Sequence, residues 1–392
     1  MSGAPGDLGD GVWDTVVVGA GPAGSLCARQ LALGGRRVLL VERSVFPRAK
    51  VCGACLGAGG VGVLERAGMG GLLDELGAAA VRRTRLVWRG RSLRVPMRGM
   101  VTVSRRAMDA ALAHAAERAG AVFVQGVRAS WDGAAGIGSG PVAVRLESDE
   151  RAVEARTRSL VIAGGLRTAD ADGVGGASVD ERSWIGLGAS GPAGDAGVFG
   201  ADELTMVAAP HGYVGRIVTE DGVANWAAAV DPRSLRRFGG PAGAVRAIME
   251  NAGLAGGLVG GLDAGPPGSG WTGTPALTRR TPAQRGCVYR VGDAAGYVEP
   301  ITGEGMTWAL LGAAALAPVV EAAIGSGRHE PVWAARHASL LRVRRARCRL
   351  VARSLRSPLI MRAAFLGLGS GGAVGEMLVN RLIGAPGVAG RA

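Results

Sequence analysis

Short apolar runs alternate with longer stretches of mixed polarity near the N-terminus. Residues 13–43 read WDTVVVGAGPAGSLCARQLALGGRRVLLVER, and Val16–Val18 form the first uninterrupted apolar run. A strand that is buried on both faces of a parallel sheet needs such a run. Leu26–Leu33 continue with helical spacing up to a glycine pair, and Arg37–Val41 give a second apolar run. The pattern predicts a strand, a glycine turn, a helix and a second strand.

Later segments extend this pattern. Ser104–Gly126 predicts a helix that runs into a strand, and Leu160–Gly165 predicts a short buried strand. Arg82–Met97 alternates between apolar and polar residues, as a half-buried strand does. Cys287–Ala323 predicts a strand, a loop and a long helix. From about residue 170 to 275, short strands with Gly and Pro turns predict a separate β-rich layer.

The order of these elements predicts a mixed α/β (α+β) fold, with a Rossmann-type cofactor domain and an inserted β-sheet substrate domain. The chain has 392 residues, enough for one large domain or two interleaved ones. We expect residues 1–80, 100–165 and 276–325 to form a discontinuous cofactor domain, 81–99 and 166–275 a substrate domain, and 326–392 a helical C-terminal segment.

The glycine turn carries the first chemical signal. Gly19, Gly21 and Gly24 give the spacing G-x-G-x-x-G between the first predicted strand and helix. The first glycine permits the tight turn, the second lets the backbone approach a pyrophosphate, and the third lets helix and strand pack closely. The N–H groups at the helix N-terminus can bind the phosphates. Glu42 follows the second strand and can accept hydrogen bonds from a ribose diol, so this segment predicts a dinucleotide site.

Composition and charge narrow the class of protein. Hydrophobic residues make up 48% of the chain, which excludes a disordered protein. The formal net charge of +13 is compatible with nucleic acid, an anionic membrane or acidic ligands as partners. The sequence has no zinc-finger or helix-turn-helix signature and no stacking motif, so we expect no nucleic acid partner.

We expect a cytoplasmic protein. The first residues lack the charged and apolar regions of a signal peptide. No uninterrupted apolar stretch reaches the roughly 20 residues that span a bilayer, so no transmembrane span is expected. Five cysteines, an odd number, favour free thiols in a reducing compartment.

The stretch FPRAKVCGACLG holds the only lysine of the chain, Lys50, beside Cys52 and Cys55. These residues could form a metal site, a redox pair or the rim of a cofactor pocket. A zinc site needs a second pair of ligands, but the other three cysteines stand alone in the sequence, so no metal is expected. A thiol redox pair and a cofactor contact both remain open on the residues alone.

Three segments together resemble one flavoprotein superfamily. They are VVVGAGPAG…LLVER, FPRAKVCG and GDAAGYVEPITGEGM, which occur in this order between about residues 12 and 325. The set resembles the FAD proteins of glutathione-reductase type with the hydroxybenzoate-hydroxylase architecture. The geranylgeranyl reductase-like group is the nearest match, and aromatic hydroxylases and flavin halogenases are its cousins. The resemblance implies that FAD is the cofactor.

The resemblance also implies roles for the residues that match these motifs. Cys52 and Gly53 would contact FAD, with Lys50 near its ring or phosphates, and Asp293 would hold the ribityl chain. A helix N-terminus near Gly305 would stabilise the negative charge of reduced flavin. The complete set of implied cofactor-binding residues is Gly19, Gly21, Ala23, Gly24, Glu42, Arg43, Lys50, Cys52, Gly53, Arg105, Val127, Asp293, Gly303, Gly305 and Met306.

The chain departs from each branch of the superfamily. The hydroxylases carry an Asp-Gly pair after the later buried strand, where this chain has Ala163 followed by two glycines. This puts direct reduction by NAD(P)H in doubt and makes a partner reductase the alternative electron donor. Of the Tyr-x-Trp-x-Phe-Pro stretch of prenyl reductases only Tyr213 remains. The halogenase signature Trp-x-Trp-x-Ile-Pro is absent and no lysine follows Lys50, so halogenation is not expected.

Three residues are candidates for catalysis: Lys50, His211 and Tyr213. An imidazole of near-neutral pKa could deprotonate a phenol or protonate a reduced carbon. The alternative is a surface histidine in a turn beside a tyrosine of the core.

The C-terminal segment His337–Leu359 has the spacing of one basic amphipathic helix, and eight arginines lie between Arg342 and Arg362. Such a helix could rest on an anionic membrane. It could equally pack on the cofactor domain with a solvated basic face, so peripheral contact with the inner face of the membrane remains an alternative to a purely cytoplasmic protein.

These features predict an FAD-dependent oxidoreductase, a monooxygenase or a reductase, for a hydrophobic small molecule such as a polyketide-like phenol or an isoprenoid. The reaction would be hydroxylation through a flavin hydroperoxide or hydride transfer from reduced flavin. Two alternatives are a prenyl (geranylgeranyl) double-bond reductase and a flavoprotein maturation factor for another enzyme.

Overall fold

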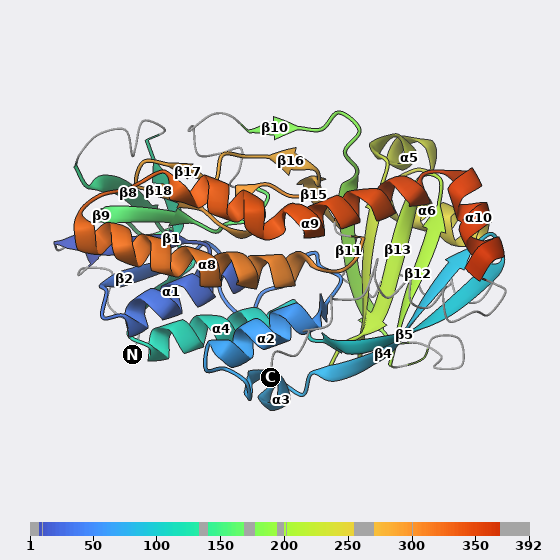
Figure 1. Cartoon of the computed structure of the whole chain (residues 1–392), viewed down its shortest axis with the longest axis horizontal. Helices are drawn as coiled ribbons and strands as arrows, with labels where there is room; N and C mark the ends of the chain where they lie inside the picture. Colours follow the sequence, from blue (N-terminus) through green and yellow to red (C-terminus); the bar gives the residue numbers. More distant parts are fainter. Residues whose placement is uncertain are drawn as a thin grey trace.

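Two sheets lie side by side along the long axis of the molecule, and helix α9 (Val332–Leu355) extends from one sheet to the other (Figure 1). The computed structural model describes residues 8–9, 11–132, 140–167, 177–193, 200, 202–254, 270–299 and 301–368. The arrangement confirms the predicted mixed α/β fold with a Rossmann-type first half.

The first sheet has a parallel centre. Its strand order is β17-β18-β9-β1-β2-β6, and the neighbours from β18 to β6 pair in parallel. An antiparallel extension, β7 with β8, joins it through β9. The strands of this sheet are β1 (Val12–Val18), β2 (Val38–Glu42), β6 (Val122–Gln125), β7 (Arg128–Trp131), β8 (Val142–Glu147), β9 (Ala152–Ile162), β17 (Gln284–Arg285) and β18 (Val288–Arg290).

The unbroken apolar run in β1 is explained by two cores, one on each face of the sheet. Val17 packs into a core that contains residues of α1 (Pro22–Leu33), α4 (Arg105–Arg118) and α8 (Gly305–Ser326). Its neighbours Val16 and Val18 point to the other face, where they pack with residues of β8 and β9. Since both faces are covered, an apolar side chain is favoured at each of these three positions.

The helices of the first sheet begin where the sequence supplies suitable residues. α1 starts with Pro22, whose fixed φ and missing N–H suit the first helical position. α4 is capped by Ser104, whose hydroxyl accepts a hydrogen bond from Ala107 N at 3.2 Å. Residues 43–54, between β2 and β3, form a loop that we call the Lys50 loop. After it and β3 come the two short helices α2 (Ala58–Arg66) and α3 (Leu72–Glu75).

The second sheet has the order β15-β11-β14-β13-β12-β4-β5-β3. All its neighbours pair antiparallel except β12 and β4, which pair in parallel. Its strands are β3 (Cys55–Leu56), β4 (Ala79–Trp88), β5 (Arg91–Thr102), β11 (Ile185–Pro192), β12 (Glu203–Ala209), β13 (Gly212–Val218), β14 (Val223–Val230) and β15 (Thr272–Ala276). The pair β10 (Ser178–Val179) and β16 (Arg279–Arg280) stands apart from both sheets.

The two faces of the second sheet have different neighbours. Val214 of β13 packs with Val245 and Ile248 of α6 (Pro241–Asn251), which follows the short helix α5 (Pro232–Arg237). Tyr213, the adjacent residue, packs on the opposite face with Leu355 of α9. The second face of this sheet is therefore covered by the C-terminal helices.

The C-terminal segment corrects one prediction. A single helix from His337 to Leu359 was expected, but α9 ends at Leu355 and a separate helix, α10 (Pro358–Leu368), begins after a short break. Pro358 explains the break, because proline lacks the N–H that a continuing helix needs and clashes with the preceding turn. The break lets α10 turn over the end of the second sheet (Figure 1).

Helix α8 is long and apolar enough to cross a membrane by its length and composition, with a mean hydropathy of 1.7. Half of that window is buried within the protein, where Leu310 and Leu316 pack in the same core as α1. Burial of this kind is the property of a core helix in a folded domain. The predicted domain boundaries stay predictions, and the β4–β5 hairpin that enters the second sheet runs from Ala79 to Thr102.

Candidate functional site

A cavity of about 530 Å³ is lined by residues of both sheets. On the side of the first sheet, the cavity is lined by the glycine turn after β1, the end of β2, the Lys50 loop and the residues that follow β9. On the side of the second sheet, the cavity is lined by residues of β11, β12, β13, β14 and β15. The N-terminal end of α8 completes the lining with Gly305 and Met306.

Two of the three glycines of the turn are required by their contacts. Gly19 has φ +102°, and a Cβ there would lie 2.7 Å from backbone atoms at the end of β9. A Cβ on Gly24 would lie 1.8 Å from the carbonyl oxygen of Gly19, so any side chain would push α1 off the turn. Gly21 is different, because a Cβ there would meet only the ends of Arg105 and Arg48, at 3.6 and 3.9 Å. The space beside Gly21 is therefore open and faces two guanidinium groups.

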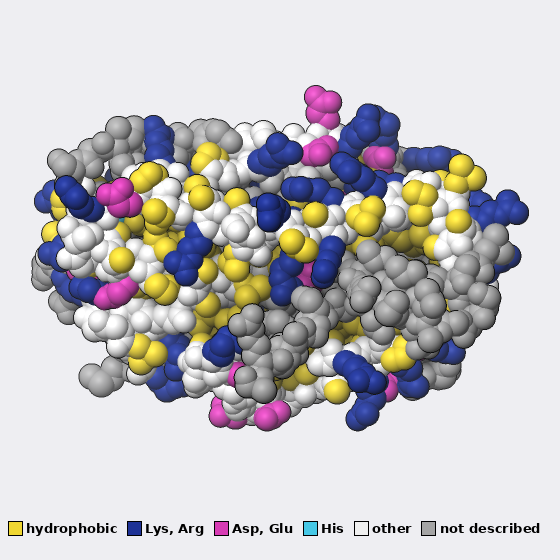
Figure 2. Space-filling model, in the orientation of Figure 1, with side chains coloured by type: hydrophobic (Ala, Val, Ile, Leu, Met, Phe, Trp, Pro, Cys, Tyr) yellow, Lys and Arg dark blue, Asp and Glu magenta, His cyan; other side chains and the backbone are white. Residues whose placement is uncertain are grey.

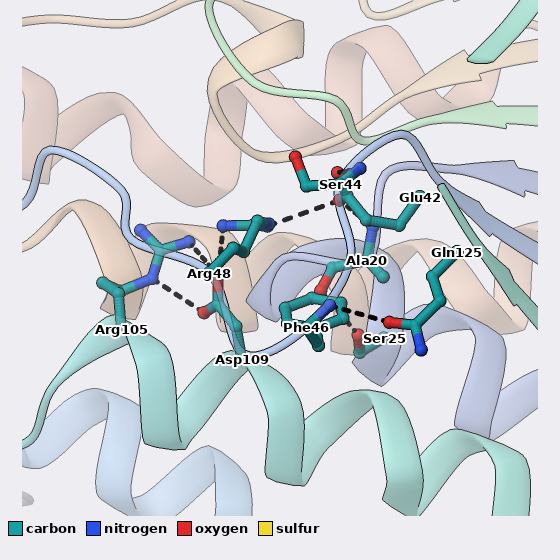
Figure 3. Close-up of polar contacts among 9 residues, drawn as sticks. All are labelled: Ala20, Ser25, Glu42, Ser44, Phe46, Arg48, Arg105, Asp109 and Gln125. Atoms are coloured by element: carbon teal, nitrogen blue, oxygen red, sulfur yellow. Dashed lines mark hydrogen bonds and ion pairs between the residues drawn. The ribbon is translucent and has the colours of Figure 1, made fainter. Parts of the chain in front are cut away.

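Glu42 is fixed in the position that a ribose-binding carboxylate needs. Its side chain is buried at the end of β2 and accepts hydrogen bonds from the N–H groups of Ala20 and Ser44, each at 3.1 Å (Figure 3). Arg48 lies 3.4 Å from the same carboxylate. These donors orient Glu42 at the rim of the cavity, which it lines.

A buried carboxylate holds the two arginines beside Gly21. Asp109 of α4 is fully buried and accepts two hydrogen bonds of 2.7 Å from Arg105, while Arg48 lies 3.0 Å from one of its oxygens (Figure 3). Burial opposes the charge of Arg105, but the attraction of Asp109 outweighs it and raises the pKa of Arg105. The Nε of Arg48 has no hydrogen-bond partner in the described part of the chain. Both guanidinium groups border the open space at Gly21, where an anionic ligand could accept hydrogen bonds from them.

This arrangement suits the pyrophosphate of a dinucleotide. Arg105 was predicted as a cofactor residue, whereas Arg48 and Asp109 were missed. The spacing of Arg105 and Asp109, four residues apart on a helix, was a signal that could have indicated their ion pair. Arg48 comes from a loop that the sequence alone does not bring to α4.

Lys50 lines the cavity and its side chain remains accessible there. Burial lowers the pKa of its ammonium group, Arg105 and Arg48 lower it further, and Asp293 and Asp109 act in the opposite direction. Burial also raises the pKa of Asp293, against the effect of Lys50 and of Arg105. A Cβ on Gly165, at the end of β9, would lie 2.8 Å from Lys50 Nζ. The only lysine thus occupies the end of the strand where the hydroxylases have their Asp-Gly pair.

The wall from the second sheet contrasts with this charged half. The lining residues of β11 to β15 are all uncharged, and many are small, as at Gly215 and Ala227–Ala229. Tyr213 is the titratable residue that these strands contribute. Burial raises its pKa well above the usual value, and the charge of Glu299 adds to this effect. The cavity is therefore charged at its cofactor end and neutral at its other end.

Behind Tyr213 lies a buried carboxylate that sequence reasoning missed. Glu299 accepts a hydrogen bond of 2.5 Å from Arg356 of α9 through Oε2, while its Oε1 has no partner among the described residues. Burial raises its pKa to about 7, although Arg356 acts in the opposite direction. The Arg356 guanidinium also lies 4.1 Å from the ring of Trp184, which contacts Tyr213. Glu299 is thus poised to exchange a proton near neutral pH beside the neutral end of the cavity.

The two thiols of the Lys50 loop do not form a disulfide, and their surroundings differ. Burial, with a smaller effect of Cys52, raises the pKa of Cys55 to about 12. A thiol of such high pKa forms little thiolate and makes a poor redox partner. Cys52 lines the cavity, and its carbonyl oxygen accepts a hydrogen bond from Asn225 of β14 at 2.8 Å. Among the residues that the structure describes, no three His, Cys, Asp or Glu side chains gather as a metal site.

The cavity brings together most of the predicted site residues, whose roles as cofactor ligands stay predictions. Those that line it are Gly19, Gly21, Ala23, Glu42, Arg43, Lys50, Cys52, Gly53, Arg105, Val127, Asp293, Gly303, Gly305 and Met306. Gly24 lies outside the lining and acts through packing. Of the catalytic candidates, Lys50 and Tyr213 line the cavity, whereas His211 lies in the turn before β13 with its ring 5.2 Å from that of Phe238.

Comparison with known proteins agrees with this geometry. Residues 13–177 match the family model described as FAD binding domain. A menaquinone reductase of Mycobacterium tuberculosis is 34% identical over 170 residues, which cover 40% of this chain and 38% of that protein. Squalene epoxidase 4 of Arabidopsis thaliana is 32% identical over 87 residues, 22% of this chain and 17% of that protein. The chain therefore spans about two fifths or less of the curated relatives it matches.

Solved structures extend the likeness to the whole fold. The flavin-dependent brominase Bmp2 superposes with a TM-score of 0.76 over 95% of this chain and 94% of that chain, at 17% identity. At this identity the likeness concerns the fold alone. The matched model shows an FAD binding domain over residues 13–177, which supports FAD as the cofactor, and the superposition shows the shared fold.

Proposed function

We propose that the chain reduces a carbon–carbon double bond of a hydrophobic, isoprenoid-type molecule. The observation that carries this proposal is the division of the cavity into a charged cofactor end and an uncharged end formed by the second sheet. A neutral apolar substrate loses little hydration on entering the uncharged end, whereas an anionic one would leave its charge unpaired there. The names of two relatives, a menaquinone reductase and a squalene epoxidase, support an isoprenoid over a polyketide-like phenol.

The cofactor end fits FAD. The open space at Gly21 lies beside Arg105 and Arg48 for the pyrophosphate, and Glu42 is oriented for a ribose diol. Lys50 and Asp293 also line the cavity, and each favours the charged form of the other. Bound in reduced form, FAD would supply the electron pair for the substrate.

The proton for the second carbon would come from the protein. Tyr213 borders the uncharged end and is the nearest acid that the second sheet supplies. Because burial raises its pKa, it holds its proton firmly until a stronger base forms on the substrate. Glu299 would then return a proton to Tyr213, since the pKa of Glu299 is lower than that of Tyr213. Trp184 and Leu277 pack around Tyr213 and exclude water from this path.

The electron donor is part of the proposal. Gly164 and Gly165 after β9 line the cavity, Lys50 Nζ lies beside Gly165, and the described residues that directly follow the strand, 163–167, include no carboxylate. We expect a partner reductase to reduce the protein faster than NADH or NADPH does. The test is anaerobic stopped-flow absorbance of the flavin with each nucleotide and with a reduced ferredoxin-type donor.

The test of the reaction uses the FAD-loaded protein, reduced with dithionite under nitrogen and mixed with a menaquinone bearing an isoprenoid tail. After any quinol has been reoxidised to the quinone, mass spectrometry should show a gain of two hydrogens in the isoprenoid tail, in single turnover, and none with photochemically bleached flavin. A gain of one oxygen after admission of air would instead establish a monooxygenase. Binding of FAD with neither product, together with stable co-purification of one protein, would replace an enzymatic role by a maturation role.

A further inference from the structure

The C-terminal helices carry an exceptional share of the protein's positive charge. Residues 331–368 hold nine of the 45 basic residues of the chain and none of the 32 acidic ones. This segment of 38 residues therefore accounts for nine units of the net charge of +13. Figure 2 shows Lys and Arg side chains along the course of α9, with hydrophobic atoms between them.

The arginines divide into an inner and an outer group. Arg344, Arg345 and Arg356 point inward, to Glu304, the carbonyl of Gly296 and Glu299. The outer group makes no ion pair with a described residue, and it consists of Arg336, Arg342, Arg347, Arg349, Arg353 and Arg362. Five of these six are exposed, and Arg347 is partly buried. The charge of the outer group is thus directed to the outside of the molecule.

Exposed aliphatic side chains accompany this outer group. Within the described ranges, eight large hydrophobic side chains are exposed, and five of them belong to α9 and α10. These five are Val332, Val343, Leu350, Leu359 and Ile360, of which Leu359 is 80% exposed. Val343 and Leu350 are seven residues apart and therefore lie on one side of α9, next to Arg342 and Arg349. Apolar and cationic side chains consequently share one outer face.

The inner face of the same helices packs against the second sheet, which forms the uncharged end of the cavity. Leu355 of α9 and Met361 and Phe365 of α10 are buried in one cluster with Tyr213 and Trp88. The ring of Phe365 stacks on that of Trp88 at 5.7 Å. A single layer of helices therefore separates the outer face from the second sheet.

We propose that the outer face of α9 and α10 binds the surface of an anionic lipid bilayer. Arginines would pair with lipid phosphates, and Leu350, Leu359 and Ile360 would enter the apolar boundary beneath them. The proposal rests on this surface and not on the reaction at the cavity, although it would bring the uncharged end close to a membrane-dissolved substrate. Nucleic acid is disfavoured as the occupant, because it would leave these aliphatic side chains uncovered and the described part of this face exposes no aromatic ring for stacking.

The test is flotation of the full-length FAD-loaded protein with vesicles of phosphatidylcholine alone or with 30% phosphatidylglycerol. Two variants address the two components of the surface: Arg342→Gln/Arg349→Gln/Arg353→Gln for charge, and Leu359→Ser/Ile360→Ser for apolar contact. All five positions are exposed, so folding should be retained, which circular dichroism checks. A matched control, Arg66→Gln/Arg106→Gln/Arg118→Gln, removes three exposed arginines from α2 and α4.

We expect binding to the anionic vesicles that weakens with salt and that the charge variant reduces about 100-fold, at about fivefold for each arginine. The apolar variant should also weaken it, and the control should retain at least a third of the wild-type affinity. Equal binding to both vesicle types, no binding, or an equal loss in the control would overturn the proposal. So would stronger binding to a DNA or RNA oligonucleotide that the charge variant abolishes and the apolar variant leaves unchanged.

Discussion

Replacement of Glu299 by glutamine tests the buried proton source behind Tyr213. Glu299 is 2% exposed, and its pKa rises from 4.5 to about 7 on folding, mainly through burial. A carboxyl with a raised pKa stabilises the fold in its neutral form and disfavours it once ionised. Stability from this group is therefore complete below pH 4.5 and is lost as the pH rises through about 7.

The size of the effect follows from the change in pKa. A difference of about 2.5 between the folded value and the reference value corresponds to about 3 kcal/mol of the free energy of unfolding. Arg356 already opposes part of the burial cost, and this attraction is included in the folded value. Wild type should thus lose about 3 kcal/mol relative to Glu299→Gln between pH 4.5 and pH 8.

The assay is urea unfolding followed by tryptophan fluorescence at half-unit steps of pH, for wild type and Glu299→Gln. The difference between the two isolates Glu299 from other titrating groups, such as His337, whose pKa burial lowers to about 3. Glu304→Gln is the matched control, because Glu304 also pairs with an arginine of α9, Arg344. Parallel pH dependences in wild type and Glu299→Gln would refute the assignment of a buried, near-neutral carboxyl. In turnover, the rate of the wild type should decline above pH 7, and the variant should be slow without this decline.

Other predictions concern the site and its supports. Gly24→Ala should cost about 2–3 kcal/mol of stability and abolish FAD binding, since its Cβ would lie 1.8 Å from the Gly19 oxygen. Fluorescence-monitored unfolding and flavin content measure the two effects. The control Gly273→Ala, whose Cβ would have no atom within 4 Å, should change neither stability nor flavin content. Asp109→Asn leaves the guanidinium groups of Arg105 and Arg48 without their shared carboxylate, so we expect a loss of about 3–5 kcal/mol in urea unfolding, and an unchanged midpoint would contradict the buried ion pair. Tyr213→Phe should keep the affinity for FAD, measured by flavin fluorescence, and slow product formation at least tenfold; full activity would remove Tyr213 from the reaction.

The local parts of the cofactor site could be predicted from the sequence, because neighbouring residues determine them. The glycine spacing, the apolar run of β1 and the position of Glu42 all lie within about thirty residues, where backbone sterics and burial patterns act directly. The break at Pro358 was equally local and was overlooked, since the helical spacing of the apolar residues suggested one continuous helix.

Contacts between distant segments could not be predicted. Arg48 meets Asp109 only because the Lys50 loop returns over α4, and Glu299 meets Arg356 across 57 residues of chain. The neutral end of the cavity depends on which faces of five strands turn inward, and the registers of their mutual pairs fix this.

The sequence by itself determined that this protein has a dinucleotide-binding turn, an apolar parallel sheet and a basic C-terminal segment. Only the tertiary structure decided which charges are buried, which oxygen of Glu299 lacks a partner, and which arginines of α9 point outward. The reason is physical: residue type sets the intrinsic charge and size of a side chain, whereas pKa and accessibility depend on the dielectric and the neighbours that folding assembles around it.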